Sequence, residues 1–285
     1  ISAATGLTNG QPAIDLNSGR DILLPSSATQ LTANTSGGVK LTAGRNIDLM
    51  YADSCCSSIA RSIGAPGDIT LTATSGMIFR NAGDDYRNLS GANVSLTAGT
   101  SIGPFGNIAA TGNASLNAGT TLTTSGFGVT AASGIGLSAS GAIATSTLSA
   151  GTTLTVASSA DAVSLGSASA QDIQVDAVTG ISTSALTATA GKLRLTNTGA
   201  TSDIYIAGDL QASNAALAAN EWAIDLSSGR DIVLPSWATQ LTAHTSGGIR
   251  LVATRNVDLL NADSCCSAIA RSLTAQGDVA ITATS

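Results

Sequence analysis

The sequence predicts an all-β fold, a parallel β-helix in which short strands return once per coil of about 20 residues. Three observations predict it. Two series of apolar-polar-apolar triplets share one period, Gly, Asn, Ser and Asp fill the segments between triplets, and no apolar stripe with helical spacing appears. An antiparallel sandwich also uses short strands, but it does not require so regular a return.

The triplets recur in two parallel series. The first series begins at Val94, Ala114, Ile135, Leu154, Ile173, Leu193 and Ala215. The second begins at Ile102, Leu122, Ile143, Val163, Ile181, Ile204 and Ile224, with the same average spacing. Each triplet has the alternation of a short strand with one buried face.

Stacked coils place equivalent residues roughly 4.7–4.9 Å apart. Ile and Leu are then expected to form continuous internal ladders, and Thr and Ser external ones. About 14 coils of this length fit the chain, which predicts a rod of roughly 65–70 Å. Gly, Asn, Ser and Asp supply the tight turns between strands.

One long block of sequence occurs twice, at residues 13–75 and again at residues 223–285, displaced by 210 positions. The copies are identical at 45 positions. Repetition on this scale is typical of elongated modular proteins. We therefore expect residues 1–285 to form one continuous solenoid segment of a longer array. We expect that array to continue with a segment like the one that follows the first copy.

Three segments depart from the regular period and predict loop insertions, at residues 51–66, 80–91 and 261–276. Insertions in a solenoid tend to fall on one face, often the binding face. The expected contact residues in them are Asp53, Arg61, Asp84, Asp85, Tyr86, Asp263 and Arg271.

All four cysteines lie in the two duplicated insertions, as the adjacent pairs Cys55–Cys56 and Cys265–Cys266. A disulfide within each pair, a disulfide between chains or units, and free or metal-bound thiols are all compatible with this pattern. Metal binding is the weakest alternative, because adjacent cysteines without a further Cys or His cluster are not a usual zinc spacing. Disulfides would indicate an oxidising compartment.

Composition excludes several functions. The net charge is −6, and Lys40 and Lys192 are the only lysines, so no basic patch for nucleic acid is expected. No stretch reaches the roughly 20 apolar residues of a membrane helix. Calcium binding by the aspartates is a minor alternative, and no cofactor or metal is predicted. His244, Trp222 and Trp237 are replaced in the first copy, which predicts incidental roles for them.

The segments "GVKLTAGRNIDL", "GDITLTATSG" and "ANVSLTAGTSI" resemble coils of filamentous-haemagglutinin-type exoproteins. These are bacterial surface adhesins exported by two-partner secretion. The resemblance covers essentially the whole chain, but it is one of coil pattern, and no counterpart of the family's secretion domain is visible. It implies a right-handed parallel β-helix, an extracellular or cell-surface location and an outer-membrane secretion partner.

The sequence favours a non-catalytic adhesive rod that presents repeated loops to a receptor or glycan on a host or neighbouring cell, or to other copies of itself. An ice-binding solenoid is one alternative, because "TAT" occurs at Thr72, Thr187 and Thr282. A polysaccharide-active enzyme is another, because such enzymes also use parallel β-helices. Neither a paired-carboxylate constellation nor aromatic platforms can be read from the sequence.

Overall fold

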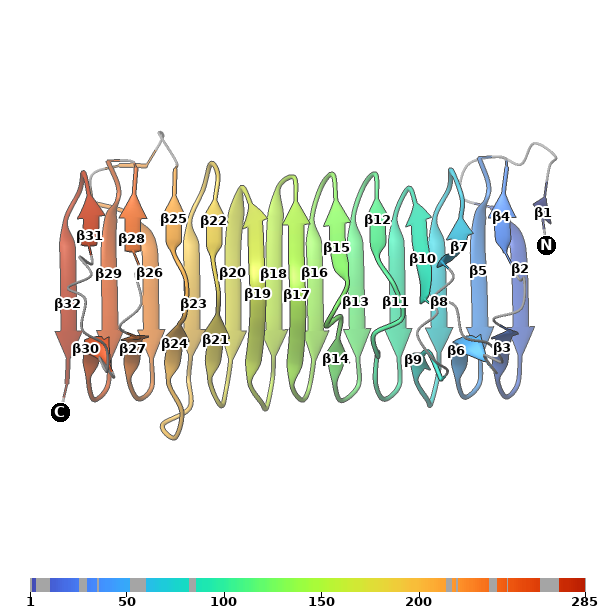
Figure 1. The fold of residues 1–285 in the computed structure, drawn as a ribbon, viewed down its shortest axis with the longest axis horizontal. Helices are drawn as coiled ribbons and strands as arrows, with labels where there is room; N and C mark the ends of the chain where they lie inside the picture. The colour runs from blue at the N-terminus through green and yellow to red at the C-terminus, as the bar shows by residue number, and fades with distance from the viewer. Residues whose placement is uncertain are drawn as a thin grey trace. The chain divides into compact units, whose positions relative to one another are not determined.

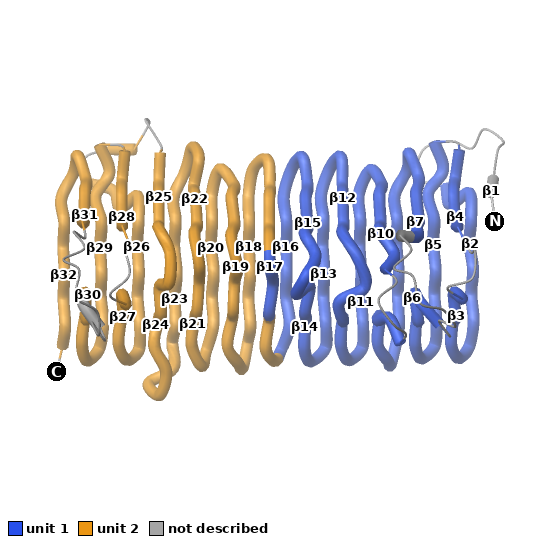
Figure 2. Tube along the Cα trace, viewed as in Figure 1, with its two compact units in different colours: residues 1–140, 144–146 blue, residues 141–143, 147–285 orange. Residues whose placement is uncertain are grey.

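The computed structural model describes residues 2–3, 11–25, 30–34, 36–51, 60–81, 86–213, 217–218, 220–235, 240–244, 246–261 and 272–284. Every regular element of these residues is a β-strand, and the strands pair in parallel. No helix among them is long and apolar enough to cross a bilayer. The chain divides into two compact units (Figure 2), residues 1–140 with 144–146 and residues 141–143 with 147–285.

In the first unit, each coil contributes strands to three parallel ladders (Figure 1). The first ladder contains β2 (Pro12–Ser18), β5 (Gly38–Ala43), β8 (Ile69–Ala73), β11 (Val94–Ala98), β13 (Ala114–Ala118) and β16 (Ile135–Ala139). The second contains β3 (Ile22–Pro25), β6 (Ile47–Tyr51), β9 (Ile78–Phe79), a bridge at Ile102 and β14 (Leu122–Thr123). The third contains β1 (Ser2–Ala3), β4 (Leu31–Ala33), β7 (Ala60–Gly64), β10 (Tyr86–Gly91), β12 (Ile108–Ala110) and β15 (Gly128–Ala131).

The second unit repeats this arrangement. Its first ladder contains β18 (Thr153–Ser158), β20 (Asp172–Ala177), β23 (Leu193–Asn197), β26 (Trp222–Ser228), β29 (Gly248–Ala253) and β32 (Val279–Ala283). The second runs from the start of β19 (Val163–Ala170) through β21 (Ile181–Thr183), β24 (Ile204–Ile206), β27 (Ile232–Pro235) and β30 (Val257–Asn261). The third runs from the end of β19 through β22 (Leu186–Ala188), β25 (Leu210–Ala212), β28 (Gln240–Ala243) and β31 (Ser272–Ala275). β17 (Ile143–Ala150) contributes residues to both units.

The core of each unit is a set of apolar columns that run from coil to coil. In the first ladder, Leu71 is in register with Leu41 on one side and Leu96 on the other. All three side chains are fully buried. Alternate residues of each strand face inward, as expected of a strand with one buried face. The predicted parallel β-helix is therefore confirmed.

Asparagine and aspartate side chains tie successive coils together at the corners. The backbone N–H of Asn93 donates to Asp68 Oδ1 (3.1 Å), and the N–H of Asn113 donates to Asn93 Oδ1 (2.9 Å). The N–H of Gly134 extends the row by donating to Asn113 Oδ1 (2.9 Å). Each side chain thus accepts from the next coil a backbone N–H that the sheet ladders leave free.

The duplicated blocks carry the same ion pair between coils. Arg45 pairs with Asp21 in the first copy, and Arg255 pairs with Asp231 in the second. In each copy the arginine hydrogen bond holds the pKa of the aspartate below its ordinary value. Asn46 donates its backbone N–H to Asp21 Oδ1 (3.1 Å). This contact ties the residue before β6 to the neighbouring coil.

Coil length varies more than the sequence period predicts. In the first ladder Ile14 pairs with Val39, Val39 with Ile69, and Val94 with Ala114, so the second of these coils is the longest and the third the shortest. The extra residues of the longest coil lie between its second-ladder and third-ladder strands. Among the described residues each unit therefore has six first-ladder strands, fewer than a constant short coil implies.

Two positions in the predicted series were assigned to the wrong ladder or partner. Leu193 pairs with Ile224, so Ile224 belongs to the first ladder and not the second. The second ladder continues instead from Ile204 to Ile232. Ala215, the partner predicted for Leu193, lies outside the described residues. The coil from Leu193 to Ile224 is longer than the average period of the series. Counting one period from Leu193 therefore ends before the next first-ladder strand begins.

The predicted loop insertions contain strands. Residues 60–64 of the first form β7, residues 86–91 of the second form β10, and residues 272–275 of the third form β31. β7 and β10 pair with each other in register, and Ile63 of β7 and Leu89 of β10 are fully buried. The third ladder needs these apolar residues, which is why the chain returns to strand within each insertion.

Deleting one link of a core column is expected to destabilise the protein strongly. Leu96→Ala removes a fully buried side chain between Leu71 and Leu116, so we expect a loss of about 2–5 kcal/mol in the free energy of unfolding. The neighbouring Thr97→Ala changes an exposed residue of the same strand and is expected to cost at most about 0.5 kcal/mol. Urea unfolding followed by circular dichroism measures both, and equal effects would contradict the inward orientation of Leu96.

A matched pair of glycines tests the turn after β14. Gly126 has a φ of 84°, and the turn is closed by the N–H of Phe127 donating to Thr124 O (2.9 Å). An alanine is strained at this φ, so Gly126→Ala is expected to lower the free energy of unfolding by about 1–2 kcal/mol. Gly136, within β16, has open space where a Cβ would lie, and Gly136→Ala is expected to be neutral or stabilising by up to about 1 kcal/mol. The same unfolding assay compares them, and a stabilised Gly126→Ala would refute the turn.

Candidate functional site

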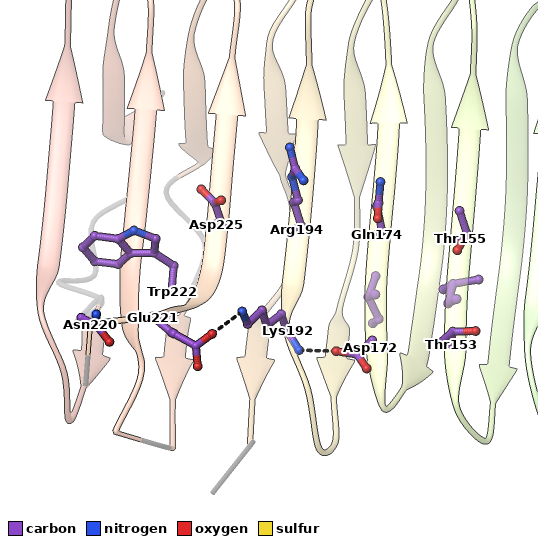
Figure 3. A pocket seen from close by; sticks show the side chains of 12 residues that line it. Thr153, Thr155, Asp172, Gln174, Lys192, Arg194, Asn220, Glu221, Trp222 and Asp225 are labelled. Atoms are coloured by element: carbon purple, nitrogen blue, oxygen red, sulfur yellow. Dashed lines mark hydrogen bonds and ion pairs between the residues drawn. The ribbon is translucent and has the colours of Figure 1, made fainter. Parts of the chain in front are cut away.

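A groove lies on the outer face of the first ladder in the second unit (Figure 3). Its volume is about 630 Å³. The floor of the groove is formed by β18, β20 and β23. Residues 220–222, which lead into β26, line the groove beside this floor. Polar side chains contributed by four successive coils therefore share one open surface.

The floor is built from outward-facing residues in register. Thr155 of β18 is paired with Gln174 of β20, Gln174 with Arg194 of β23, and Arg194 with Asp225 of β26. Side chains at equivalent positions of parallel strands lie roughly 4.7–4.9 Å apart. A ligand lying across the strands thus meets a hydroxyl, an amide, a guanidinium and a carboxylate in turn.

A second row runs beside the first and is fixed by hydrogen bonds. Lys192 donates from Nζ to Glu221 Oε1 (2.9 Å), and its backbone N–H donates to Asp172 Oδ1 (2.7 Å), as Figure 3 shows. A Cβ at Gly191 would lie 1.8 Å from Asp172 Oδ1, so glycine is what lets this carboxylate reach the backbone. Glu221 Oε2 also accepts from the N–H of Ala218 (3.1 Å).

Trp222 forms one end of the groove. A Cβ at Gly248 would lie 2.8 Å from the indole ring, so the absence of a side chain at Gly248 makes room for it. The guanidinium of Arg250 lies 5.8 Å from the ring centroid in a cation–π contact. Arg250 also donates from Nε and Nη2 to both oxygens of Asp225, at 2.8 and 2.6 Å. The indole and the carboxylate are therefore held by the same arginine.

Carboxylates outnumber cations by one in the lining of the groove. Asp172, Glu221 and Asp225 line it with Lys192 and Arg194, and Arg250, which pairs with Asp225, lies outside the lining. Lys192 and Arg250 are committed to ion pairs. The side chain of Arg194 is exposed, and it forms no ion pair within the described part of the chain. Its donors are available to a ligand.

Only the Trp222 end of the groove has counterparts beside the first copy of the duplicated block, because β18, β20 and β23 lie outside that block. Gln11 and Pro12 stand where the second copy has Glu221 and Trp222, and Lys40 stands in place of Arg250. A different hollow of about 110 Å³ is lined by these three residues and by neighbouring residues of β5 and β8. The two copies therefore share a backbone and differ in the side chains at one end of the groove.

All four disulfide candidates and most of the contact residues predicted from the sequence lie outside the described residues. These are Cys55, Cys56, Cys265, Cys266, Asp53, Asp84, Asp85, Asp263 and Arg271. Trp237 lies outside them too. The predicted roles of all these residues stay predictions.

Tyr86 and Arg61 are described, and both lie on third-ladder strands rather than on loops. Tyr86 begins β10, and the centroid of its ring lies 5.7 Å from the centroid of the Phe127 ring. Arg80 lies over the same phenylalanine ring, 5.4 Å from its centroid. Arg80 and Tyr86 of the second insertion thus both contact the ring of Phe127.

Arg87 is a buried residue that sequence reasoning missed. Its side chain points from β10 into the core and is fully buried, and its Nε donates to the carbonyl of Leu49 (2.7 Å). Burial, and then the charge of Arg61 in the adjacent strand, lowers the pKa of Arg87 to about 10. The alternation of β10 places this position inward, which the sequence could have indicated had residues 86–91 been read as a strand.

The groove residues were also missed. Trp222 was interpreted as incidental because Pro12 stands at the equivalent position, and Arg194 and Gln174 were not singled out. A usable signal was present, since Thr155, Gln174 and Arg194 each lie between the two apolar residues of a first-series triplet and so recur at the coil period. Within the described ranges no three residues of the types His, Cys, Asp and Glu are placed to hold a metal ion together.

Comparisons with protein-family models, with curated proteins and with solved structures find no match to this chain. The resemblance to filamentous-haemagglutinin-type exoproteins therefore stays a prediction from the coil pattern.

The ion pair in the groove predicts an unusual titration. Hydrogen bonding from Lys192 lowers the pKa of Glu221 below its ordinary 4.5, so the contribution of this pair is complete above that pH and is lost as the pH falls through the lowered value. Glu221 is the only glutamate in the sequence, so carbon-13 labelling of glutamate gives a single carboxyl signal for NMR titration. We expect a midpoint below 4.5 that rises in Lys192→Met and does not change in Lys40→Met. A midpoint insensitive to Lys192→Met would contradict the pairing.

Proposed function

We propose that the chain is a structural and adhesive segment of a bacterial surface or extracellular fibre, non-catalytic, whose repeated surfaces attach to cells or to other fibres. The observation that supports it is the duplication of one block of strands with the same pairing. β2 and β5 pair with a register shift after Pro12, and β26 and β29 pair with the same shift after Trp222. Repeated sites on one chain bind multivalently, so individually weak contacts suffice for attachment.

The carboxylates of the groove favour binding over catalysis. A glycoside-cleaving enzyme needs a carboxyl group whose pKa is raised so that it can act as a general acid. Hydrogen bonding from Lys192 instead lowers the pKa of Glu221. Both oxygens of Asp225 accept from Arg250. Glu221 and Asp225 therefore hold Lys192 and Arg250 in fixed positions.

The threonine pattern gives less support to ice binding. Thr72 is in register with Thr42 and Thr97 on the first ladder, but Asn117 follows Thr97 in the same row. Thr187 lies on β22, which belongs to a third ladder. Absence of thermal hysteresis in the purified protein would remove this alternative.

Attachment can be tested directly with the purified chain. Latex beads coated with the protein are expected to adhere several-fold more than albumin-coated beads to cultured epithelial monolayers or to bacterial lawns, because many copies engage at once. Small-angle scattering of the soluble protein is expected to give an elongated particle. Adhesion no greater than that of albumin on both surfaces, or a globular scattering profile, would refute the proposal.

A further inference from the structure

We propose that the groove on β18, β20, β23 and β26 binds a neutral oligosaccharide lying across the strands. The juxtaposition of Arg194, Gln174 and Trp222 in a groove of about 630 Å³ is the basis of this assignment. The inference names a ligand class for the proposed attachment function and rests on that function.

The floor offers the hydrogen-bonding groups that hydroxyl-rich ligands use. Gln174 presents an amide, with Nε2 donating to Asp176 Oδ2 (2.6 Å), and its carbonyl oxygen can accept from a ligand. Arg194 presents donors in a planar fork. Asp172 and Thr155 add acceptors and a hydroxyl. Neighbouring sugar hydroxyls, which both donate and accept, complement such a mixed set.

The spacing of the floor also suits a chain of sugars. Its polar groups repeat once per coil, at roughly 4.7–4.9 Å, which is comparable to the length of one pyranose unit in an extended chain. Trp222 lines one end of the groove, and its partly exposed indole lies over β29, beyond β26 (Figure 3), so a sugar at the end of a chain that crosses β26 can pack on it. Arg250 and Gly248 fix the indole in place, so little side-chain entropy is lost on binding.

Other ligand classes fit this groove less well. A peptide that adds to a sheet needs an unpaired strand edge, but β20 and β23 already pair on both sides. A polyanion such as nucleic acid or a sulfated glycan needs a clear excess of cations. Here three carboxylates and two cations line the groove, and Arg250 pairs with one of the carboxylates, so the lining has no excess of cations and favours an uncharged ligand over a polyanion.

The experiment uses the full chain and defined probes. Cellohexaose, maltohexaose, chitohexaose and mannohexaose are titrated as neutral probes, with hexagalacturonate and a heparin hexasaccharide as charged ones, and binding is followed by calorimetry and by tryptophan fluorescence. We expect at least one neutral hexasaccharide to bind in the micromolar to millimolar range. Arg194→Ala and the double variant E221Q/W222P are each expected to weaken it about tenfold or more.

The variants are matched to the structure. E221Q/W222P installs the residues of the first copy, Gln11 and Pro12, on a backbone that already accommodates them. Arg20→Ala, an exposed arginine of the first unit, serves as the control and is expected to bind like the parent. Circular dichroism and the melting temperature of each variant separate lost binding from lost fold.

Each outcome decides the proposal. Binding of a neutral probe that Arg194→Ala and E221Q/W222P weaken, and Arg20→Ala does not, supports it. No binding of any probe, binding insensitive to the groove variants, or binding of the charged probes alone overturns it. If bead adhesion persists while all hexasaccharides fail, the groove assignment is wrong and the attachment function stands. If beads fail to adhere while a neutral probe binds, the groove assignment stands and the attachment function is wrong.

Discussion

Inward-facing apolar side chains must line up from coil to coil, and the other features of each unit follow from this requirement. One coil cannot bury its own apolar face, so Leu71 is stable only between Leu41 and Leu96. Register cannot slip by one residue, because that would turn every buried side chain outward. Corner aspartates and asparagines, tight glycine turns and ion pairs between coils hold that register where the strands end.

The same requirement leaves the outward face free to vary. A residue such as Arg194 is fixed in position by the buried Leu193 and Leu195 on either side, yet its own side chain contributes nothing to the column. The duplicated blocks use this freedom, since Trp222 replaces Pro12 without altering the pairing of the strand. The groove is thus a surface modification of a scaffold whose geometry is set from within.

The fold was predictable from sequence because alternation and a regular period report directly on inward positions. Series members such as Val94, Ala114 and Ile135 were paired correctly. The period failed at Ile224, where a long coil breaks the count, and at β10, where the strand was hidden in an expected loop. The groove was harder to predict, because it depends on which outward residues become neighbours across coils of unequal length. Lys192 and Glu221 are 29 positions apart in sequence and form one ion pair.

The pairing of each first-ladder strand with the next coil along the chain has a consequence for how such a protein is made. Every strand finds its partner within a short stretch of sequence, so a finished coil presents an open edge that templates the next one. Assembly can proceed in one direction, coil after coil, as the polypeptide emerges from a ribosome or a secretion pore. Lengthening such a protein by duplication then adds stability without requiring a new folding nucleus.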